Sequence, residues 1–477
     1  MRRPRGNLSL GLVDRTRDRI ASSVLKRITP LADSPEYPPS LVLGSWTYGI
    51  LSLLARLCGF DPLQVDGVLQ DGAGRRALWN FLRSLSDYGV GTPQTLKAPV
   101  SVVWSLSYGC NLRCMHCYQN ASRPSPDELT FDQQLSIVDQ LARAGVSMVV
   151  LSGGEPLTNP NLGKLIERIR AHDMAISIDS NGVLMDRSVV ESLKRAGVTS
   201  VELSLDSVDA RSHDRFRGLE GAFEKTLDAV EICSKAGMFT TVATTATALN
   251  YADTSELIKL AKSHGADRVV FFDLIPAGRG RDIEELRLSR RQLLDLMALV
   301  KEESSRNGVE VFTELPQFVV YSSNADGNSL PSHADRTVMI ERFTVSTFFD
   351  CSGRDNIYRR YAPYLGGCPA GRFYCNIQPN GDVTPCMFMP EYPVAGNLRT
   401  QSFEEIWASP TFQALRDRTL LKGKCGECKF TIVCGGCRAK AAAYEGDYLA
   451  SDPTCPIHNG SAPLHSREVM ASTLLQS

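Results

Sequence analysis

The sequence predicts an α/β protein in which six strand-and-helix units form an open, partial (β/α)6 barrel of the TIM type. From Val100 onward, short β-rich runs alternate with amphipathic helices, which is the rhythm of a parallel sheet. These units occupy fewer residues than the roughly 250 of a complete eight-unit barrel. A mainly helical extension is expected before the barrel, and a cysteine-rich domain is expected after it.

The N-terminal extension contains two candidate helices. In residues 41–60 the apolar side chains recur at helical spacing, namely at Trp46, Ile50, Leu53, Leu54 and Leu57. This stretch is about long enough to span a bilayer, but Arg56 and several small polar residues disfavour a spanning helix. A helix buried on a core is favoured, and a helix lying on a membrane or an apolar substrate is the alternative. A second helix is expected over 75–85, before the turn residues 89–93.

Six strands are expected in the barrel, each separated from the next by about one helix's length of chain. They are residues 100–106, 148–151, 175–178, 201–205, 240–243 and 268–272. Thr130 and Gln133 form a candidate capping box at the start of one helix, and Gly145, Gly197 and Gly237 end three helices. Active sites of such barrels lie where strands end and helices begin.

Three cysteines follow the first predicted strand. Cys110, Cys114 and Cys117 are separated by three and two residues. A [4Fe–4S] cube normally takes four thiolates, so a loop that offers three leaves one iron open to another ligand. The spacing differs from the paired C-x2-C of zinc sites, which makes a structural zinc knuckle the minor alternative.

A glycine-rich loop follows the second predicted strand. Gly153 and Gly154 remove side chains where a backbone could approach a ligand, and Glu155 could accept a hydrogen bond from an ammonium group. Alone, the loop would equally suit an ordinary turn. Its position after the cysteine loop favours a binding site.

The cysteine spacing, the Cys-Met-His-Cys-Tyr stretch at 114–118 and the Gly-Gly-Glu-Pro stretch at 153–156 together resemble radical SAM enzymes. The resemblance implies that S-adenosylmethionine (SAM) binds the open iron. One electron would then cleave SAM to a 5′-deoxyadenosyl radical, which abstracts hydrogen from an unactivated carbon. By this resemblance the catalytic and metal-ligating residues are Cys110, Cys114 and Cys117, and the SAM amino group is held by Gly153, Gly154 and Glu155.

Further SAM contacts are expected at the ends of later strands. Asn181 and Ser204 follow or end the third and fourth predicted strands, where ribose hydroxyls and a carboxylate could be met. Arg217 resembles a family position that meets the SAM carboxylate, with a solvated arginine as the alternative. The family position of His116 packs on adenine, so it is not a predicted iron ligand. The stretch 276–280 resembles the substrate-side loop of the family.

Eight further cysteines lie in the C-terminal region, at Cys368, Cys375, Cys386, Cys425, Cys428, Cys434, Cys437 and Cys455. Eight thiolates are enough for two fully ligated cubes. Their order resembles the SPASM extension of radical SAM enzymes, and the stretches 381–386 and 452–455 support this. A zinc ribbon on the two C-x2-C pairs is the alternative.

The SPASM resemblance implies two auxiliary [4Fe–4S] clusters. One would be held by Cys368, Cys375, Cys386 and Cys437, and the other by Cys425, Cys428, Cys434 and Cys455. The gap before Cys437 is two residues, whereas three is common in the family, so the cluster that this residue joins is left open.

The net charge and the cysteine content of the chain indicate which partners and which cellular compartment to expect. The formal net charge of −1 provides no field that would attract nucleic acid. Most of the fourteen cysteines fall in tight clusters and no secretory signal is recognised, so a reducing cytoplasm is expected, with membrane association through the N-terminal region as an alternative.

The C-terminal motifs look most like the radical SAM enzymes of haem d1 and alternative haem biosynthesis. The implied substrate is a peptide, a protein side chain or a tetrapyrrole, and the implied reductant is a protein such as flavodoxin or ferredoxin. Radical modification of membrane lipid is an alternative that rests on residues 41–60. A non-catalytic electron-transfer protein is another, which the loop at 153–156 disfavours because a carrier needs no amine-binding loop.

The expected domain organisation has five parts. They are the N-terminal extension at 1–98, the radical SAM core at 99–281, a bridging segment at 282–360, the SPASM domain at 361–460 and a tail at 461–477.

Overall fold

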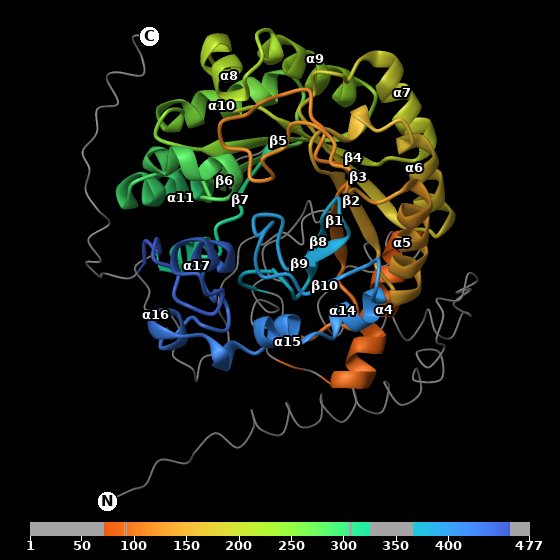
Figure 1. Cartoon of the computed structure of the whole chain (residues 1–477). Helices are drawn as coiled ribbons and strands as arrows, with labels where there is room; N and C mark the ends of the chain where they lie inside the picture. Colours follow the sequence, from red (N-terminus) through yellow and green to blue (C-terminus); the bar gives the residue numbers. More distant parts are fainter. Residues whose placement is uncertain (1–70, 90, 92, 305–307, 325–365, 458–477) are drawn as a thin grey trace, which may run out of the picture.

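The computed structural model describes residues 71–89, 91, 93–304, 308–324 and 366–457. In this part of the chain one curved, ten-stranded sheet carries helices on its outer face (Figure 1). The strands lie in the order β10-β9-β8-β1-β2-β3-β4-β5-β6-β7. Their bounds are β1 Ser101–Ser105, β2 Met148–Ser152, β3 Ala175–Ser180, β4 Ser200–Ser204, β5 Phe239–Ala246, β6 Arg268–Asp273, β7 Glu310–Thr313, β8 Tyr374–Ile377, β9 Asp382–Thr384 and β10 Gly396–Asn397.

All six predicted strands are confirmed as β1 to β6, and they pair in parallel in chain order. The structure adds one parallel strand at each edge, because β7 pairs with β6 and β8 pairs with β1. The sheet is open, with β10 and β7 at its two edges, so the partial barrel is confirmed. Since β8 comes from the cysteine-rich region, that region is continuous with the barrel wall.

The helices between the strands follow one another round the outside of the sheet. They are α5 Phe131–Ala144, α6 Leu162–Ala171, α7 Arg187–Ala196, α8 Ala210–Arg217, α9 Ala222–Lys235, α10 Thr254–Ser263 and α11 Arg290–Ser304, with short 3-10 turns η1 Pro156–Thr158, η2 Tyr251–Asp253 and η3 Gly278–Leu286. The predicted capping box of α5 is confirmed, since the Thr130 and Gln133 side chains each accept from the other's backbone N–H. Gly145 and Gly197 end α5 and α7 in the left-handed conformation, as expected.

Alternation along the strands separates an apolar outer face from a polar interior. Trp104, Leu151 and Ile178 belong to the core between sheet and helices. Their neighbours in sequence, such as Ser105 and Asp179, therefore face the interior of the barrel. The interior is thus the side on which polar chemistry can be placed.

The predicted helix over 75–85 is confirmed as α4 Gly72–Tyr88, which Asp71 caps. Arg76 donates to the carbonyl oxygens of Val146 and His172, and Asn80 bonds both the N–H and the C=O of Ala98. These bonds fix α4 to the barrel. The stretch 41–60 lies outside the described residues. No helix in the described ranges has the length and apolar composition needed to cross a membrane.

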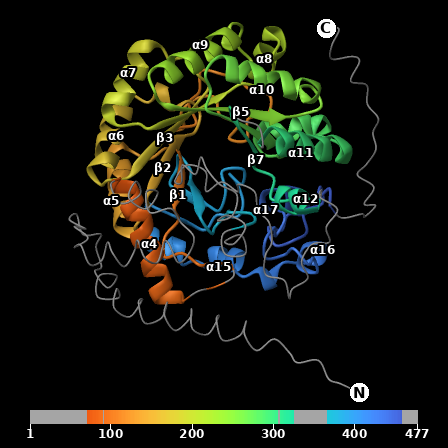
Figure 2. The same cartoon turned by 180° about the vertical axis from the view of Figure 1, so that it is seen from behind.

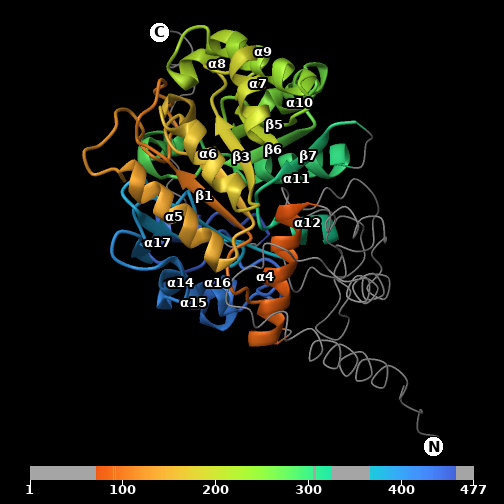
Figure 3. The same ribbon diagram turned by 90° about the vertical axis from the view of Figure 1, so that its right-hand side faces the viewer.

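The cysteine-rich region lies at the open side of the sheet, beside β7 in views from the front and the back (Figures 1 and 2), and below the strands of the barrel in the side view (Figure 3). Its helices are α14 Phe403–Trp407, α15 Pro410–Arg416, η4 Arg418–Leu420, α16 Gly423–Gly426 and α17 Arg438–Glu445, and α12 Phe318–Asn324 precedes it. Val319 and Val320 of α12 pack on Phe430 and Val433. The domain boundaries themselves stay predictions.

Candidate functional site

The cysteine loop directly follows β1, as the sequence predicted. The Cys110 sulfur accepts from the Leu112 N–H at 3.4 Å, and the Cys117 sulfur accepts from the Ala121 N–H at 3.4 Å. Burial raises the pKa of the Cys110 thiol to about 12. A coordinating metal deprotonates a thiol outright, and N–H donors stabilise the resulting thiolate. The donor set of this loop therefore fits an iron–sulfur cluster.

The glycine-rich loop is held against the cysteine loop by backbone contacts. The Gly154 N–H donates to Ser107 O at 2.7 Å, and the Glu155 N–H donates to Gly109 O at 2.9 Å. A Cβ on Gly154 would lie 1.9 Å from Gly109 O, so only glycine permits this approach. The two loops that the sequence singled out therefore form one site.

Glu155 is 1% exposed and fastens the β2 loop to the end of β3. Its carboxylate accepts from Leu157 N at 3.1 Å, Ser180 Oγ at 2.9 Å and Asn181 N at 2.9 Å. Burial raises its pKa to about 7. A carboxylate has about four acceptor positions, so one remains for an ammonium group. The expected SAM contact at Glu155 thus stays a prediction, and the structure adds a positioning role.

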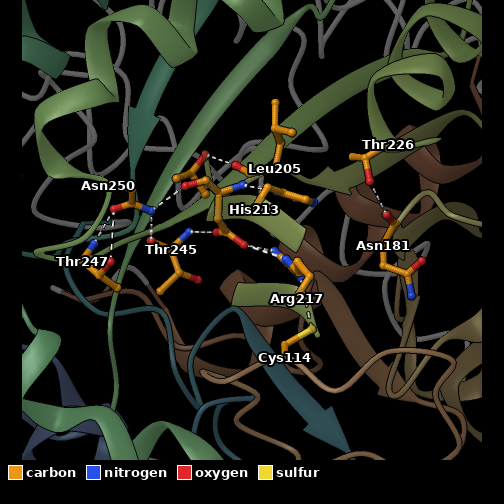
Figure 4. Close-up of polar contacts among 11 residues, drawn as sticks. Cys114, Asn181, Leu205, His213, Arg217, Thr226, Thr245, Thr247 and Asn250 are labelled. Carbon is orange, nitrogen blue, oxygen red and sulfur yellow. Dashed lines mark hydrogen bonds and ion pairs between the residues drawn. The ribbon is translucent and has the colours of Figure 1, made fainter. Parts of the chain in front are cut away.

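The structure also brings Asn181 to the cysteine loop. Its side-chain amide donates to Asn111 Oδ1 at 2.8 Å, and its carbonyl oxygen accepts from Thr226 (Figure 4). Ser204 is the last residue of β4, at the carboxyl end of the sheet where these loops gather. Both positions are consistent with the predicted SAM contacts, which remain untested.

Arg217 is buried and paired, which corrects the alternative of a solvated arginine. It forms a salt bridge with Asp206, with Nε to Oδ2 at 2.6 Å, and its Nη1 lies 3.8 Å from the Cys114 sulfur (Figure 4). Burial alone would raise the pKa of Asp206, but the Arg217 guanidinium, the neighbouring His116 and His213 and the Thr245 N–H together hold that pKa below its ordinary range. Arg217 therefore places a positive charge beside one sulfur of the predicted cluster.

Asp206 is a site residue that the sequence did not single out by itself. It follows β4, its Oδ1 accepts from the Thr245 N–H at 2.8 Å, and its own N–H donates to His213 Nδ1 at 3.2 Å. Asn250 bonds the carbonyl oxygens of Asp206 and Thr245. A carboxylate at a strand end, eleven residues before an arginine, was the available signal.

His116 is half-buried and stacks on Phe216 with ring centroids 4.4 Å apart. Burial lowers its pKa to about 3, so the ring is neutral. The stretch 276–280, which resembles the substrate-side loop of the family, lies against the cysteine loop. Arg279 donates to Cys114 O at 2.8 Å from its side chain and to Cys117 O at 3.0 Å from its backbone. Elements after β1, β2, β4 and β6 therefore all meet at the three cysteines.

A second site lies in the cysteine-rich region. A single small hollow, partly open to solvent, is lined by Cys425, Cys428, Cys434 and Cys455, the four residues predicted to share one auxiliary cluster. Backbone N–H groups donate to three of the sulfurs at 3.4 Å, from Phe430 to Cys428, from Gly436 to Cys434 and from Asp452 to Cys425. The hollow thus supplies the thiolates and donors that an iron–sulfur cluster requires.

Two buried arginines lie beside this hollow. Arg438 is fully buried and its Nη2 is 3.5 Å from the Cys425 sulfur, while Arg418 is 3% exposed and bonds Cys368 O. Neither forms a salt bridge with a carboxylate that the structure describes. A buried guanidinium without an anion is costly, and a thiolate-ligated cluster carries negative charge. The positive charge of the two arginines therefore suits a negatively charged cluster, in addition to the thiolates that would ligate it.

The other predicted ligand set is only partly assembled. Cys368, Cys386 and Cys437 share one apolar cluster. Cys375 instead belongs to the main core between sheet and helices. It lies on β8, where successive side chains face opposite sides, so Tyr374 faces the other three cysteines and Cys375 faces away. The structure therefore does not place Cys375 with the cluster to which the sequence assigned it.

Single-ion sites and four-iron clusters differ in the distances between their ligand atoms. Over the described ranges, no three His, Cys, Asp or Glu side chains are placed to hold one metal ion. The thiolates of a four-iron cube each bind a different iron, so they lie farther apart than the ligands of one zinc ion.

Iron analysis of two variants separates the ligand sets. We expect Cys434→Ala to lose about one third of the iron of anaerobically reconstituted protein, if three four-iron cubes are present. Cys375→Ala should keep the wild-type iron content, because its side chain faces the outer core. The check is iron per chain together with the iron–sulfur absorbance of both variants. An equal loss of iron in Cys375→Ala would contradict the placement of Cys375 away from Cys368, Cys386 and Cys437.

Comparison with known proteins agrees with this geometry. Residues 104–261 match the radical SAM superfamily, and residues 368–429 match the SPASM iron–sulfur cluster-binding domain. An AdoMet-dependent heme synthase of Methanosarcina barkeri is 33% identical over 76% of this chain and 98% of its own length. The chain belongs to the radical SAM superfamily. It is therefore an enzyme of the radical SAM/SPASM type, and its cofactors are SAM and [4Fe–4S] clusters.

Two further relatives illustrate the range of the superfamily. The mycofactocin maturase MftC of Mycobacterium ulcerans is 30% identical over 78% of this chain and 92% of its own length. The structure of Streptococcus suis SuiB bound to precursor peptide SuiA superposes with a TM-score of 0.58 at 17% identity, covering 81% of each chain. The latter likeness concerns the fold.

Proposed function

We propose that this enzyme abstracts a hydrogen atom from an unactivated carbon of a haem-type tetrapyrrole. The bound cofactors supply an electron and the 5′-deoxyadenosyl group that accepts the hydrogen. Cys110, Cys114 and Cys117 would hold the cluster that binds SAM. Gly153, Gly154, Glu155, Asn181, Ser204 and Arg217 would surround SAM, and a flavodoxin or ferredoxin would supply the electron.

The observation that carries the tetrapyrrole proposal is an aromatic wall between the two metal regions. Tyr118, next to Cys117, contacts Phe388, two residues after Cys386, with ring centroids 5.1 Å apart. Phe272 at the end of β6 contacts the same Phe388 ring at 5.8 Å. Aromatic rings offer a large apolar surface for a flat macrocycle. The heme synthase relative, matched over nearly its whole length, supports the same substrate class.

Three carboxyl groups lie near one another in the barrel interior. Asp179 on β3 is opposite Glu202 on β4, and Glu314 follows β7. Burial raises the pKa of Asp179 and of Glu314 to about 7, and burial followed by the neighbouring Asp179 raises that of Glu202 well above its ordinary value. Groups that titrate near neutral pH can give or take a proton. We propose that they meet the polar groups of the substrate.

A peptide is the second candidate substrate, because the mycofactocin maturase relative is also matched over most of its length. The lipid alternative depended on residues 41–60, which lie outside the described residues, so it stays a prediction. The non-catalytic alternative is not retained, since the chain belongs to an enzyme superfamily.

Substrate-stimulated SAM cleavage tests the choice. We expect an iron porphyrin with propionate side chains to raise the rate of 5′-deoxyadenosine release by dithionite-reduced enzyme about tenfold, a barrier change of about 1.4 kcal/mol. The porphyrin should change mass in step. A precursor peptide encoded beside this gene is the comparison, and stimulation by the peptide alone would replace the tetrapyrrole with the second candidate.

A further inference from the structure

The Tyr374 hydroxyl donates to the Cys386 sulfur at 2.6 Å. The pairing of β8 with β9 explains this contact. Asn376 is opposite Thr384 and Ile377 is opposite Val383 in an antiparallel pair. Continuing that register by two residues brings Tyr374 opposite Cys386. The hairpin therefore fixes the phenol on this sulfur.

The contact lies in a largely apolar environment, in which Cys386 is buried and Tyr374 is half-buried. Tyr374 packs in the apolar cluster that contains Cys368, Cys386 and Met389, with Cys437 at its edge. Cys386 is 6% exposed, and the backbone N–H of Phe388 is the other hydrogen-bond donor to its sulfur. A hydrogen bond is electrostatically stronger where water is excluded. The phenol O–H therefore affects the buried Cys386 sulfur more strongly than it would affect an exposed one.

A second connection joins this region to the cysteine loop after β1. Gln119 donates to Ser105 Oγ at 2.7 Å, Ser105 lies 3.4 Å from Asn376 Oδ1, and Asn376 donates to Thr384 Oγ1 at 3.3 Å. Thr384 in turn donates to Cys386 O at 3.2 Å. All four side chains are nine-tenths buried or more. Cys386 is thus held rigidly both from its sulfur side and from its backbone side.

We propose that Tyr374 is a positioning residue that sets the reduction potential of the auxiliary cluster ligated by Cys368, Cys386 and Cys437. A hydrogen bond to a ligating sulfur offsets negative charge, and the reduced cluster carries more of it than the oxidised cluster. The Tyr374 hydroxyl therefore favours the reduced state. This inference rests on the iron–sulfur part of the proposed function and is independent of the substrate.

Potentiometry of the holoenzyme without substrate tests the proposal. In Tyr374→Phe, the ratio of reduced to oxidised auxiliary cluster at a fixed potential should fall about tenfold, which is about 59 mV for one electron. The SAM-binding cluster and the four-cysteine cluster should titrate as in wild type. Tyr448→Phe is the matched control, because Tyr448 packs at the edge of the same apolar cluster and its hydroxyl bonds Thr411.

A second variant keeps the test decisive if Tyr374→Phe reduces iron content. Incorporation of 3-fluorotyrosine at position 374 keeps the ring and makes the hydroxyl a stronger donor, so the reduced fraction should rise instead of falling. An unchanged ratio in both variants, or an equal change in Tyr448→Phe, would overturn the proposal. Because no substrate is present, a wrong tetrapyrrole assignment would leave these potentials as predicted.

Discussion

Cys114→Ala lowers the release of 5′-deoxyadenosine from SAM to the level of iron-free protein. Cys114 lies between the other two thiolates of the loop, is 9% exposed and has the Arg217 guanidinium 3.8 Å from its sulfur. With two thiolates left, the loop can no longer hold a cube that normally takes four ligands. The measurement is chromatography of SAM products after dithionite reduction, together with iron content.

Cys233→Ala is the matched control for that experiment. Cys233 is buried on α9, contacts the Met185 sulfur at 3.3 Å and takes no part in the cysteine loop. Its loss should leave both iron content and SAM cleavage at wild-type levels. SAM cleavage by Cys114→Ala at the wild-type rate would show that the loop is not the catalytic cluster site.

Lys440→Met destabilises the folded holoenzyme by about 3–5 kcal/mol, because it leaves a buried carboxylate without its partner. Lys440 on α17 pairs with Asp273 at the end of β6, and the two side chains are 3% and 7% exposed. Burial alone would lower the pKa of Lys440, but the Asp273 carboxylate, together with Asp452 and Cys437, raises it above its ordinary value. The pair joins the cysteine-rich region to the barrel. Urea unfolding under anaerobic conditions measures the effect.

Lys422→Met provides the comparison, since the Lys422–Asp447 pair has side chains that are 63% and 32% exposed. Exposed pairs contribute about 1 kcal/mol or less, so this variant should unfold close to wild type. Replacing both members of the buried pair, as in Lys440→Met with Asp273→Leu, should recover most of the loss. Equal destabilisation by Lys440→Met and Lys422→Met would contradict the buried-pair explanation.

Features that depend only on residues close together in the sequence could be predicted from it. The six strands and α4 follow from local periodicity, and the capping box at Thr130 and Gln133 needs only four residues. The three-cysteine loop and the Gly153–Glu155 loop were identifiable because each is a short motif at the end of a strand. Parallel strands bring their carboxyl ends to one edge, so the meeting of these loops followed as well.

Contacts between distant segments needed the tertiary structure. The salt bridge from Arg217 to Asp206 depends on the path from β4 into α8, and the hollow lined by Cys425, Cys428, Cys434 and Cys455 gathers residues thirty positions apart. The order of the cysteines predicted that group through family resemblance. It gave no indication of the buried arginines beside it, because burial of a charge is a property of packing.

Cys375 is the clearest example of a residue whose environment the sequence alone could not predict. The eight C-terminal cysteines establish the count of thiolates, and local spacing establishes which lie close in the chain. Only the pairing of β8 with β1 decided which face of the strand each side chain occupies, and it placed Tyr374 with the predicted ligands Cys368, Cys386 and Cys437 and Cys375 in the opposite core. A strand's two faces are equivalent until a neighbour covers one of them, so that choice is made by tertiary packing and not by the local sequence.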